Sequence, residues 1–175
     1  MTEATARNLR ERAKLFDGEA ERYDRSRPAY PEGLMDQVLG SSPEDLAVLD
    51  IGCGTGIASR QMAARGARVM GVELNSNMAK VAVRHGIPTD VCDFESWDPK
   101  DRKFDRVTCA QAWHFLDHDV SVEKAVSVLH TGGKLCIFWS VGRYPEELAE
   151  ALKATYERVL PPGSPPLVIA SILTV

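Results

Sequence analysis

The feature of this sequence that most constrains its fold is a short apolar segment that leads directly into a run of alternating glycines. Residues 47–51 are Ala-Val-Leu-Asp-Ile, the length and composition of a buried strand, and residues 52–56 are Gly-Cys-Gly-Thr-Gly. A helical pattern follows from Ile57 to Arg65 and ends at Gly66. Because glycines let a backbone approach a ligand and the first N–H groups of a helix are unpaired, this segment predicts a ligand-binding loop.

The alternation of strand and helix patterns continues along the chain. Further strands are predicted over residues 68–74, 88–93, 104–111 and 134–140, and the helices between and after them start at Asn75 or Ser76, at Asp119 and at Pro145. Two more helices are predicted before the first strand, over residues 5–24 and 31–40. In the helix capped by Asp119, one face is expected to carry Val122, Ala125, Val126 and Leu129. The pattern predicts an α/β fold with helices on both faces of a doubly wound, mostly parallel sheet.

Composition narrows the range of partners. The 175 residues carry a formal net charge of −4, which gives no broad basic surface for nucleic acid. No apolar run approaches the roughly 20 residues of a membrane helix, and the first residues do not resemble a secretory signal. The four cysteines are scattered without a C-x-x-C pair, at Cys53, Cys92, Cys109 and Cys136. The spacing of the histidines matches no metal site. We therefore expect a cytoplasmic protein with reduced thiols, no bound metal and no membrane partner.

The glycine loop itself excludes one class of ligand site and disfavours another. A phosphate-binding P-loop requires a Gly-Lys-Ser/Thr ending, whereas this loop continues as Gly56-Ile57-Ala58. A dinucleotide loop would need glycine or alanine where Ile57 stands, and Asp50 would place a carboxylate near the pyrophosphate. The same carboxylate suits a ligand with an ammonium group. A nicotinamide-binding oxidoreductase remains a second, weaker interpretation.

Five segments in order resemble the motifs of class I S-adenosylmethionine-dependent methyltransferases. The first is Val48–Gly56, and the others are Val69–Glu73, Val91–Phe94, Phe104–Asp117 and Val128–Lys134. The resemblance covers roughly residues 15–140 and implies the Rossmann-like methyltransferase fold. It also implies S-adenosyl-L-methionine as the cofactor.

The Tyr-Asp-Arg-Ser-Arg-Pro-Ala-Tyr-Pro segment at residues 23–31 and the Ala-Gln-Ala-Trp-His segment at 110–114 narrow the resemblance. They are similar to the small-molecule branch that includes trans-aconitate-type methyltransferases. The implied function is methyl transfer to a small-molecule acceptor, for which a carboxylate is one candidate. The alternative is a non-catalytic methyltransferase-like protein that keeps the fold and the cofactor site.

The resemblance implies roles for particular residues. Glu73 would accept hydrogen bonds from the ribose hydroxyls, Asp93 would accept one from the adenine amino group beside Phe94, and Asp50 would orient the loop and the cofactor's amino group. The complete predicted cofactor site is Asp50, Gly52, Cys53, Gly54, Gly56, Glu73, Asp93, Phe94, Ala110 and Gln111. The predicted substrate-binding residues are Tyr23, Arg27, Tyr30, Trp113 and His114.

No catalytic residue is predicted, because methyl transfer from a sulfonium depends mainly on positioning and on exclusion of water. A carboxylate acceptor is already ionised at neutral pH, whereas a phenol or an amine calls for a base, for which His114 is the candidate.

We expect a single methyltransferase domain over residues 1–175. It would comprise an N-terminal helical lid (1–43), a cofactor-binding core (44–160) and an incomplete C-terminal segment (161–175). Related enzymes continue into two further strands, and the last segment is long enough for one. The chain is therefore expected to be truncated at its C-terminus, and to be a monomer or a homodimer prone to associate through an exposed strand edge.

Overall fold

The computed structural model describes residues 19–140 and 145–161. The chain divides into two units, residues 1–139 and residues 140–175. The sequence had grouped the last helix with the cofactor-binding core, whereas this helix falls in the second unit. Residues 5–18 of the predicted helix over residues 5–24 lie outside the described residues. The final part of that helix is present as α2.

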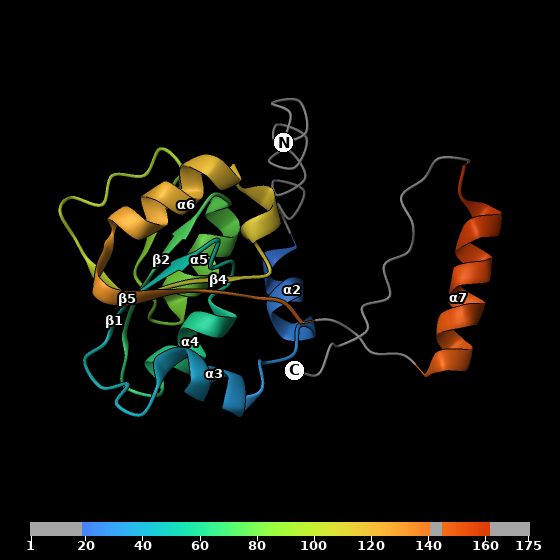
Figure 1. The fold of residues 1–175 in the computed structure, drawn as a ribbon, viewed down its shortest axis with the longest axis horizontal. Helices are drawn as coiled ribbons and strands as arrows, with labels where there is room; N and C mark the ends of the chain where they lie inside the picture. The colour runs from blue at the N-terminus through green and yellow to red at the C-terminus, as the bar shows by residue number, and fades with distance from the viewer. Residues whose placement is uncertain (1–18, 141–144, 162–175) are drawn as a thin grey trace. The chain divides into compact units, whose positions relative to one another are not determined.

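The first unit alternates strands and helices in the predicted order (Figure 1). Its elements are α2 (Ala20–Ser26), α3 (Glu32–Leu39), β1 (Ala47–Ile51), α4 (Ile57–Ala63), β2 (Arg68–Glu73), α5 (Ser76–Arg84), β3 (Thr89–Val91), β4 (Phe104–Ala110), a 3-10 turn η1 (Trp113–Phe115), α6 (His118–Ser127) and β5 (Leu129–Phe138). The described helix of the second unit is α7 (Glu146–Val159), which follows Pro145 and ends before Pro161, as predicted.

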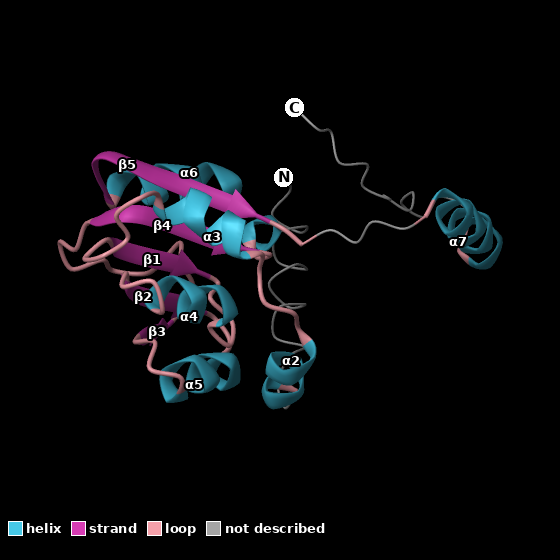
Figure 2. Ribbon diagram, turned by 90° about the horizontal axis from the view of Figure 1, so that it is seen from below, coloured by secondary structure: helices cyan, strands magenta, loops and turns pink. Residues whose placement is uncertain are grey.

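The five described strands form one parallel sheet in the order β3-β2-β1-β4-β5 (Figure 2). The chain starts in the centre at β1, proceeds outward to β2 and β3, and then crosses to β4 and β5. The strand order therefore reverses between β1 and β4. Open α/β sheets bind ligands at the carboxyl ends of the strands beside such a reversal. The glycine loop follows β1 at this position.

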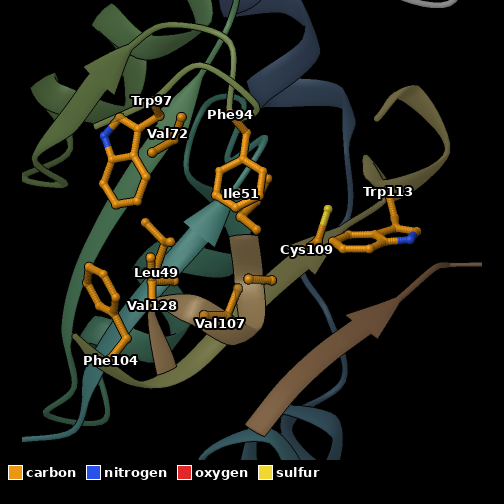
Figure 3. Close-up of a cluster of buried hydrophobic side chains, with 11 residues drawn as sticks. Leu49, Ile51, Val72, Phe94, Trp97, Phe104, Val107, Cys109, Trp113 and Val128 are labelled. Atoms are coloured by element: carbon orange, nitrogen blue, oxygen red, sulfur yellow. The ribbon is translucent and has the colours of Figure 1, made fainter. Parts of the chain in front are cut away.

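Buried side chains on both faces of the sheet confirm the doubly wound fold. On one face, Val48 and Val69 pack with Met35 of α3 and Met62 of α4. On the other face, the core includes Ala125 of α6 and the larger cluster of Leu49, Ile51, Val72, Phe94, Trp97, Phe104, Val107, Cys109, Trp113 and Val128 (Figure 3). Helices thus cover both faces, as the fold class requires.

The N-terminal cap and the inward face of α6 differ from the sequence prediction. The helix begins at His118, and the Asp117 carboxylate, not that of Asp119, accepts from the backbone N–H groups of residues 119 and 120. Val122 and Val126 are exposed, whereas Ser121 and Ala125 are fully buried. The predicted stripe of valines was therefore wrong, because the helix packs on β5 through its smallest side chains.

Two strand boundaries also differ. β5 starts at Leu129 rather than at Lys134, and its pairing with β4 has an irregularity between Phe104 and Arg106. The Gly132–Gly133 pair therefore lies inside the extended segment instead of preceding it. β3 comprises only residues 89–91 of the predicted 88–93.

None of the four cysteines forms a disulfide, and all four lie within the described residues. No helix in the described part of the chain is long and apolar enough to cross a membrane.

Candidate functional site

The glycine loop turns away from β1 under two close constraints. The N–H groups of Gly52 and Cys53 donate to the Val72 carbonyl, at 2.8 and 3.3 Å, so the end of β2 holds the first turn of the loop. Gly52 has a φ of +62°, and a Cβ placed on it would lie 2.5 Å from the Cβ of Ala112. Glycine is therefore required at position 52 for packing as well as for backbone conformation.

Glu73, the last residue of β2, holds the centre of the loop. Its Oε2 accepts from the Gly54 N–H at 2.8 Å, and its Oε1 accepts from the Asn75 N–H at 2.8 Å. Burial raises the pKa of Glu73, and these N–H groups partly offset that rise. An ionised carboxylate has about four lone-pair positions, so capacity remains for hydroxyl donors.

The space beside Gly54 is open. A Cβ on this residue would meet no atom within 4 Å among the described residues, although the φ of +58° disfavours any side chain. An open surface of backbone next to an acceptor carboxylate fits the ribose and the adjoining part of S-adenosylmethionine. The residues present therefore fit this cofactor at the end of β1 and β2.

Asp50 lies beneath the loop with no exposed surface. Its Oδ2 accepts from Ser59 Oγ of α4 at 2.5 Å, and its Oδ1 accepts from Thr108 Oγ1 of β4 at 2.9 Å. Burial raises the pKa of Asp50 to about 6 in spite of these two hydrogen bonds. The carboxylate thus ties β1 to β4 and α4.

Three of the predicted site side chains lie in the protein core. Cys53 is buried, with its Sγ 3.9 Å from Thr89 Oγ1. Phe94, which is drawn with Trp97 in Figure 3, stacks on it at 6.2 Å between ring centroids. Trp113 stacks on His118, also with 6.2 Å between ring centroids. The contacts that the sequence predicted for these three side chains with a ligand stay predictions, and their packing accounts for their residue types.

Asp93 lies just beyond β3, where its Oδ1 accepts from the Glu95 N–H at 2.9 Å. Burial and the neighbouring Asp93 side chain both raise the pKa of Glu95. Two carboxyl groups therefore share this position, of which the sequence had singled out one.

The structure brings together two predicted residues that are far apart in sequence. Burial raises the pKa of Tyr30 to about 12, with a further contribution from the Asp50 charge and an opposing one from a hydrogen bond to the Gln111 side chain. Gln111 directly follows β4, beyond Ala110, and has a φ of +64°. Tyr30 also packs edge-to-face on Phe138 at the end of β5, with 5.1 Å between ring centroids. The N-terminal segment thus reaches the carboxyl ends of β4 and β5.

Of the remaining predicted substrate residues, Arg27 and His114 are exposed and Tyr23 is half-buried. The Arg27 guanidinium lies 4.9 Å from the centroid of the Tyr23 ring. Trp139 Nε1 donates to Nδ1 of the exposed His114 at 3.4 Å. Because an indole N–H can only donate, Nδ1 is the acceptor, and the neutral imidazole carries its proton on Nε2.

The sequence reasoning missed Ser59, Thr108 and Asn75. Thr108 is a polar residue between the buried apolar residues Val107 and Cys109 of β4, and this could have indicated a partner for Asp50. Asn75 was predicted as a helix cap, and its Oδ1 does accept from the N–H groups of residues 77 and 78. No local sequence pattern indicates the hydrogen bond from the Asn75 backbone N–H to the Glu73 carboxylate. No cluster of three or more metal-ligating side chains occurs among the described residues.

The arrangement resembles that of a class I methyltransferase domain, and comparison with known proteins points to the same class. Residues 48–133 match the model of a methyltransferase domain family. This range extends from β1 to the first half of β5 and includes the glycine loop, Glu73 and Asp93. The cofactor of this class is S-adenosyl-L-methionine.

Individual relatives agree with this assignment. An uncharacterised methyltransferase of Mycobacterium tuberculosis is 33% identical over 121 residues, which cover 67% of this chain and 49% of the relative. A ubiquinone biosynthesis O-methyltransferase of Bordetella parapertussis is 32% identical over 126 residues, covering 67% and 52%. The chain spans about half the length of the curated relatives it matches.

A solved structure shows the same fold. The structure of CalS10 with bound S-adenosylmethionine, an amino pentose methyltransferase from Micromonospora echinaspora, aligns with a TM-score of 0.58 and 28% sequence identity. The alignment covers 70% of this chain and 56% of CalS10.

Proposed function

We propose that this protein catalyses methyl transfer from S-adenosylmethionine to a small-molecule acceptor. The observation that carries the proposal is the Gly54–Glu73 contact at the carboxyl ends of β1 and β2. It joins an open glycine backbone to a carboxylate that retains acceptor capacity. When bound, the cofactor supplies an electrophilic methyl group on a cationic sulfur.

In this proposal the chain's own residues hold and orient the cofactor. Glu73 accepts from the ribose hydroxyls, Asp93 accepts from the adenine amino group, and the backbone of Gly52, Gly54 and Gly56 lines the approach. Asp50 fixes the loop from below through Ser59 and Thr108. Cys53, Phe94, Ala110 and Gln111 complete the proposed site.

For the acceptor we propose an already ionised group such as a carboxylate. The favouring observation is that Trp139 donates to Nδ1 of His114, so the neutral imidazole carries its proton on Nε2. The Nδ1 atom is therefore not available as a base for a phenol or an amine, whereas an already ionised acceptor needs no base. This is the chemistry of the trans-aconitate-type branch that the sequence resembles. Tyr23, Arg27, Tyr30 and Trp113 are the other proposed substrate-side residues.

Isothermal titration with S-adenosylhomocysteine tests the cofactor site. We expect binding by the unaltered protein and a loss of about 1.5–3 kcal/mol in Glu73→Gln, because a charged acceptor is replaced by a neutral one. Glu123→Gln, at an exposed position of α6, is the matched control and should bind normally. Preferential binding of NADH would instead favour the nicotinamide interpretation.

A methyl-transfer assay separates the enzyme from its alternative. Release of S-adenosylhomocysteine is measured with a panel of carboxylates, phenols and amines. Turnover with a carboxylate supports the full proposal, and turnover only with phenols or amines would refute the acceptor class. Binding without turnover on any acceptor would favour the non-catalytic methyltransferase-like protein. A monomer or homodimer in the cytoplasm, acting on neither nucleic acid nor membranes, remains part of the proposal.

A further inference from the structure

α2 is a short helix that polar contacts hold to the rest of the first unit. Of its seven residues only Ala20 is buried, in a small cluster with Met78 and Val81 of α5. The Asp24 carboxylate is only 14% exposed and accepts from Arg60 Nη2 at 2.7 Å and from Arg60 Nη1 at 3.4 Å. His85 Nε2, at the end of α5, lies 3.3 Å from the same carboxylate.

Arg60 connects this carboxylate to the glycine loop. Its Nε donates to the Gly56 carbonyl at 3.2 Å, and Gly56 is both the last glycine of the loop and the cap of α4. One guanidinium therefore bonds α2 on one side and the loop on the other. Its planar fork of donors makes such a two-sided contact possible.

The Thr55 hydroxyl of the glycine loop lies near the same Asp24 carboxylate. Burial would raise the pKa of Asp24, but the nearby Thr55 hydroxyl and the Arg60 charge outweigh burial and lower it. The Thr55 hydroxyl is itself buried, and it forms no complete hydrogen bond with any residue in the described part of the chain.

The residue after Arg60 holds the other end of the same segment. The Tyr30 N–H donates to Gln61 Oε1 at 2.8 Å, and Gln61 Nε2 donates to the Tyr30 carbonyl at 2.7 Å. Two consecutive residues of α4 thus fix residues 24 and 30. The stretch between them contains Arg27, one of the proposed substrate residues.

We propose that Asp24 and Arg60 form a positioning clasp that couples cofactor occupancy of the glycine loop to docking of residues 20–30. The clasp rests on the proposed function, because it requires that the loop binds S-adenosylmethionine or its product. Neither residue contacts the reacting atoms in this scheme. Because coupling between two sites is reciprocal, a ligand that orders the loop must also stabilise the docked segment, and a loosened segment must weaken the ligand.

The test combines titration with S-adenosylhomocysteine and hydrogen exchange of the peptide covering residues 19–27. Asp24→Asn is compared with the unaltered protein and with Glu21→Gln, which removes the exposed contact of α2 with Arg84 but nothing on α4 or the loop. We expect Asp24→Asn to weaken S-adenosylhomocysteine about tenfold, a usual size for a coupling between sites. The ligand should slow exchange of residues 19–27 in the unaltered protein and in Glu21→Gln, but not in Asp24→Asn.

Arg60→Gln and the double variant complete the experiment. If the clasp is one unit, the double variant binds no more weakly than either single variant, whereas additive losses would overturn the clasp. Normal affinity and ligand-dependent protection in Asp24→Asn would overturn it as well while leaving the proposed function intact. If the unaltered protein fails to bind S-adenosylhomocysteine, the proposed function fails, and the coupling fails with it. Circular dichroism shows which variants are folded, and either single variant suffices for the comparison of affinity and protection.

Discussion

Replacing Gly54 by alanine should separate the loop's ligand from its contribution to stability. At φ +58°, a residue with a Cβ costs about 1–2 kcal/mol. Alanine recovers about 0.4–1 kcal/mol because it restricts the unfolded chain. The net loss of folding free energy should be about 1 kcal/mol, since the new Cβ meets no atom within 4 Å among the described residues.

Gly86→Ala is the matched control. Gly86 has a φ of +84°, its Cβ would likewise meet nothing within 4 Å in the described chain, and it follows α5, outside the proposed site. The two variants should therefore unfold at similar urea concentrations, monitored by fluorescence of the buried Trp97 and Trp113. Only Gly54→Ala should weaken S-adenosylhomocysteine, by at least about thirtyfold, or about 2 kcal/mol.

Gly52→Ala adds a clash to the same backbone cost. Its Cβ would lie 2.5 Å from the Cβ of Ala112, which has no flexible end to move, so a further loss of about 1–3 kcal/mol is expected. The order of stability should be Gly54→Ala close to Gly86→Ala, with Gly52→Ala well below both. Normal ligand affinity in Gly54→Ala, or equal weakening in Gly86→Ala, would refute the assignment of the open space beside Gly54 to the cofactor.

Two further predictions concern the interior. The folded pKa of Asp50, about 6, lies above the unfolded value near 3.9, so its protonation stabilises the protein below about pH 4, and this contribution is lost as pH rises through about 6. Urea unfolding should show that the free energy of unfolding of the unaltered protein falls by about 3 kcal/mol between about pH 4 and pH 6, and that the Asp50→Asn variant lacks this fall. Identical pH profiles of the two proteins would contradict the titration of a buried Asp50. On α6, Ala125→Leu should destabilise by about 1–3 kcal/mol because the site is filled, whereas Val126→Lys, 60% exposed, should change stability by less than about 0.5 kcal/mol. The reverse order in thermal melts would restore the valine face that the sequence suggested.

The parts of the fold that the sequence predicted well depend on local signals. β1 has the predicted bounds, and α5 starts after the predicted Asn75 cap, because an apolar run before glycines and an Asx residue before a helix each act within a few residues. The all-parallel sheet followed from the alternation of elements. The start of α6 was misplaced because Asp117 and Asp119 are both good caps, and only the packing of Ser121 and Ala125 on the sheet decides between them.

The candidate site was harder to predict, because its side chains are oriented by contacts between distant segments. The sequence placed Phe94 and Trp113 beside the ligand, since both follow strand ends, yet both side chains pack in the core. It placed both Asp50 and Glu73 in the cofactor site, Glu73 at the ribose and Asp50 beneath the loop and the cofactor's amino group. The structure differentiates them: Ser59 and Thr108, 9 and 58 residues away, enclose Asp50 completely, and Glu73 keeps part of its surface.

This difference between the two carboxylates explains how a loop built on positive-φ glycines can be held ready for a ligand. β2 fixes the loop through the Val72 carbonyl and Glu73, and Asp50 ties the strand before the loop to α4 and β4. These bonds are made between residues of the chain itself, so they order the loop as part of folding. An incoming cofactor then has to organise only its own flexible bonds and the N-terminal segment. A loop fixed in this way increases affinity by preorganisation, without new contacts. The proposed Asp24–Arg60 clasp would extend the same principle to residues 20–30.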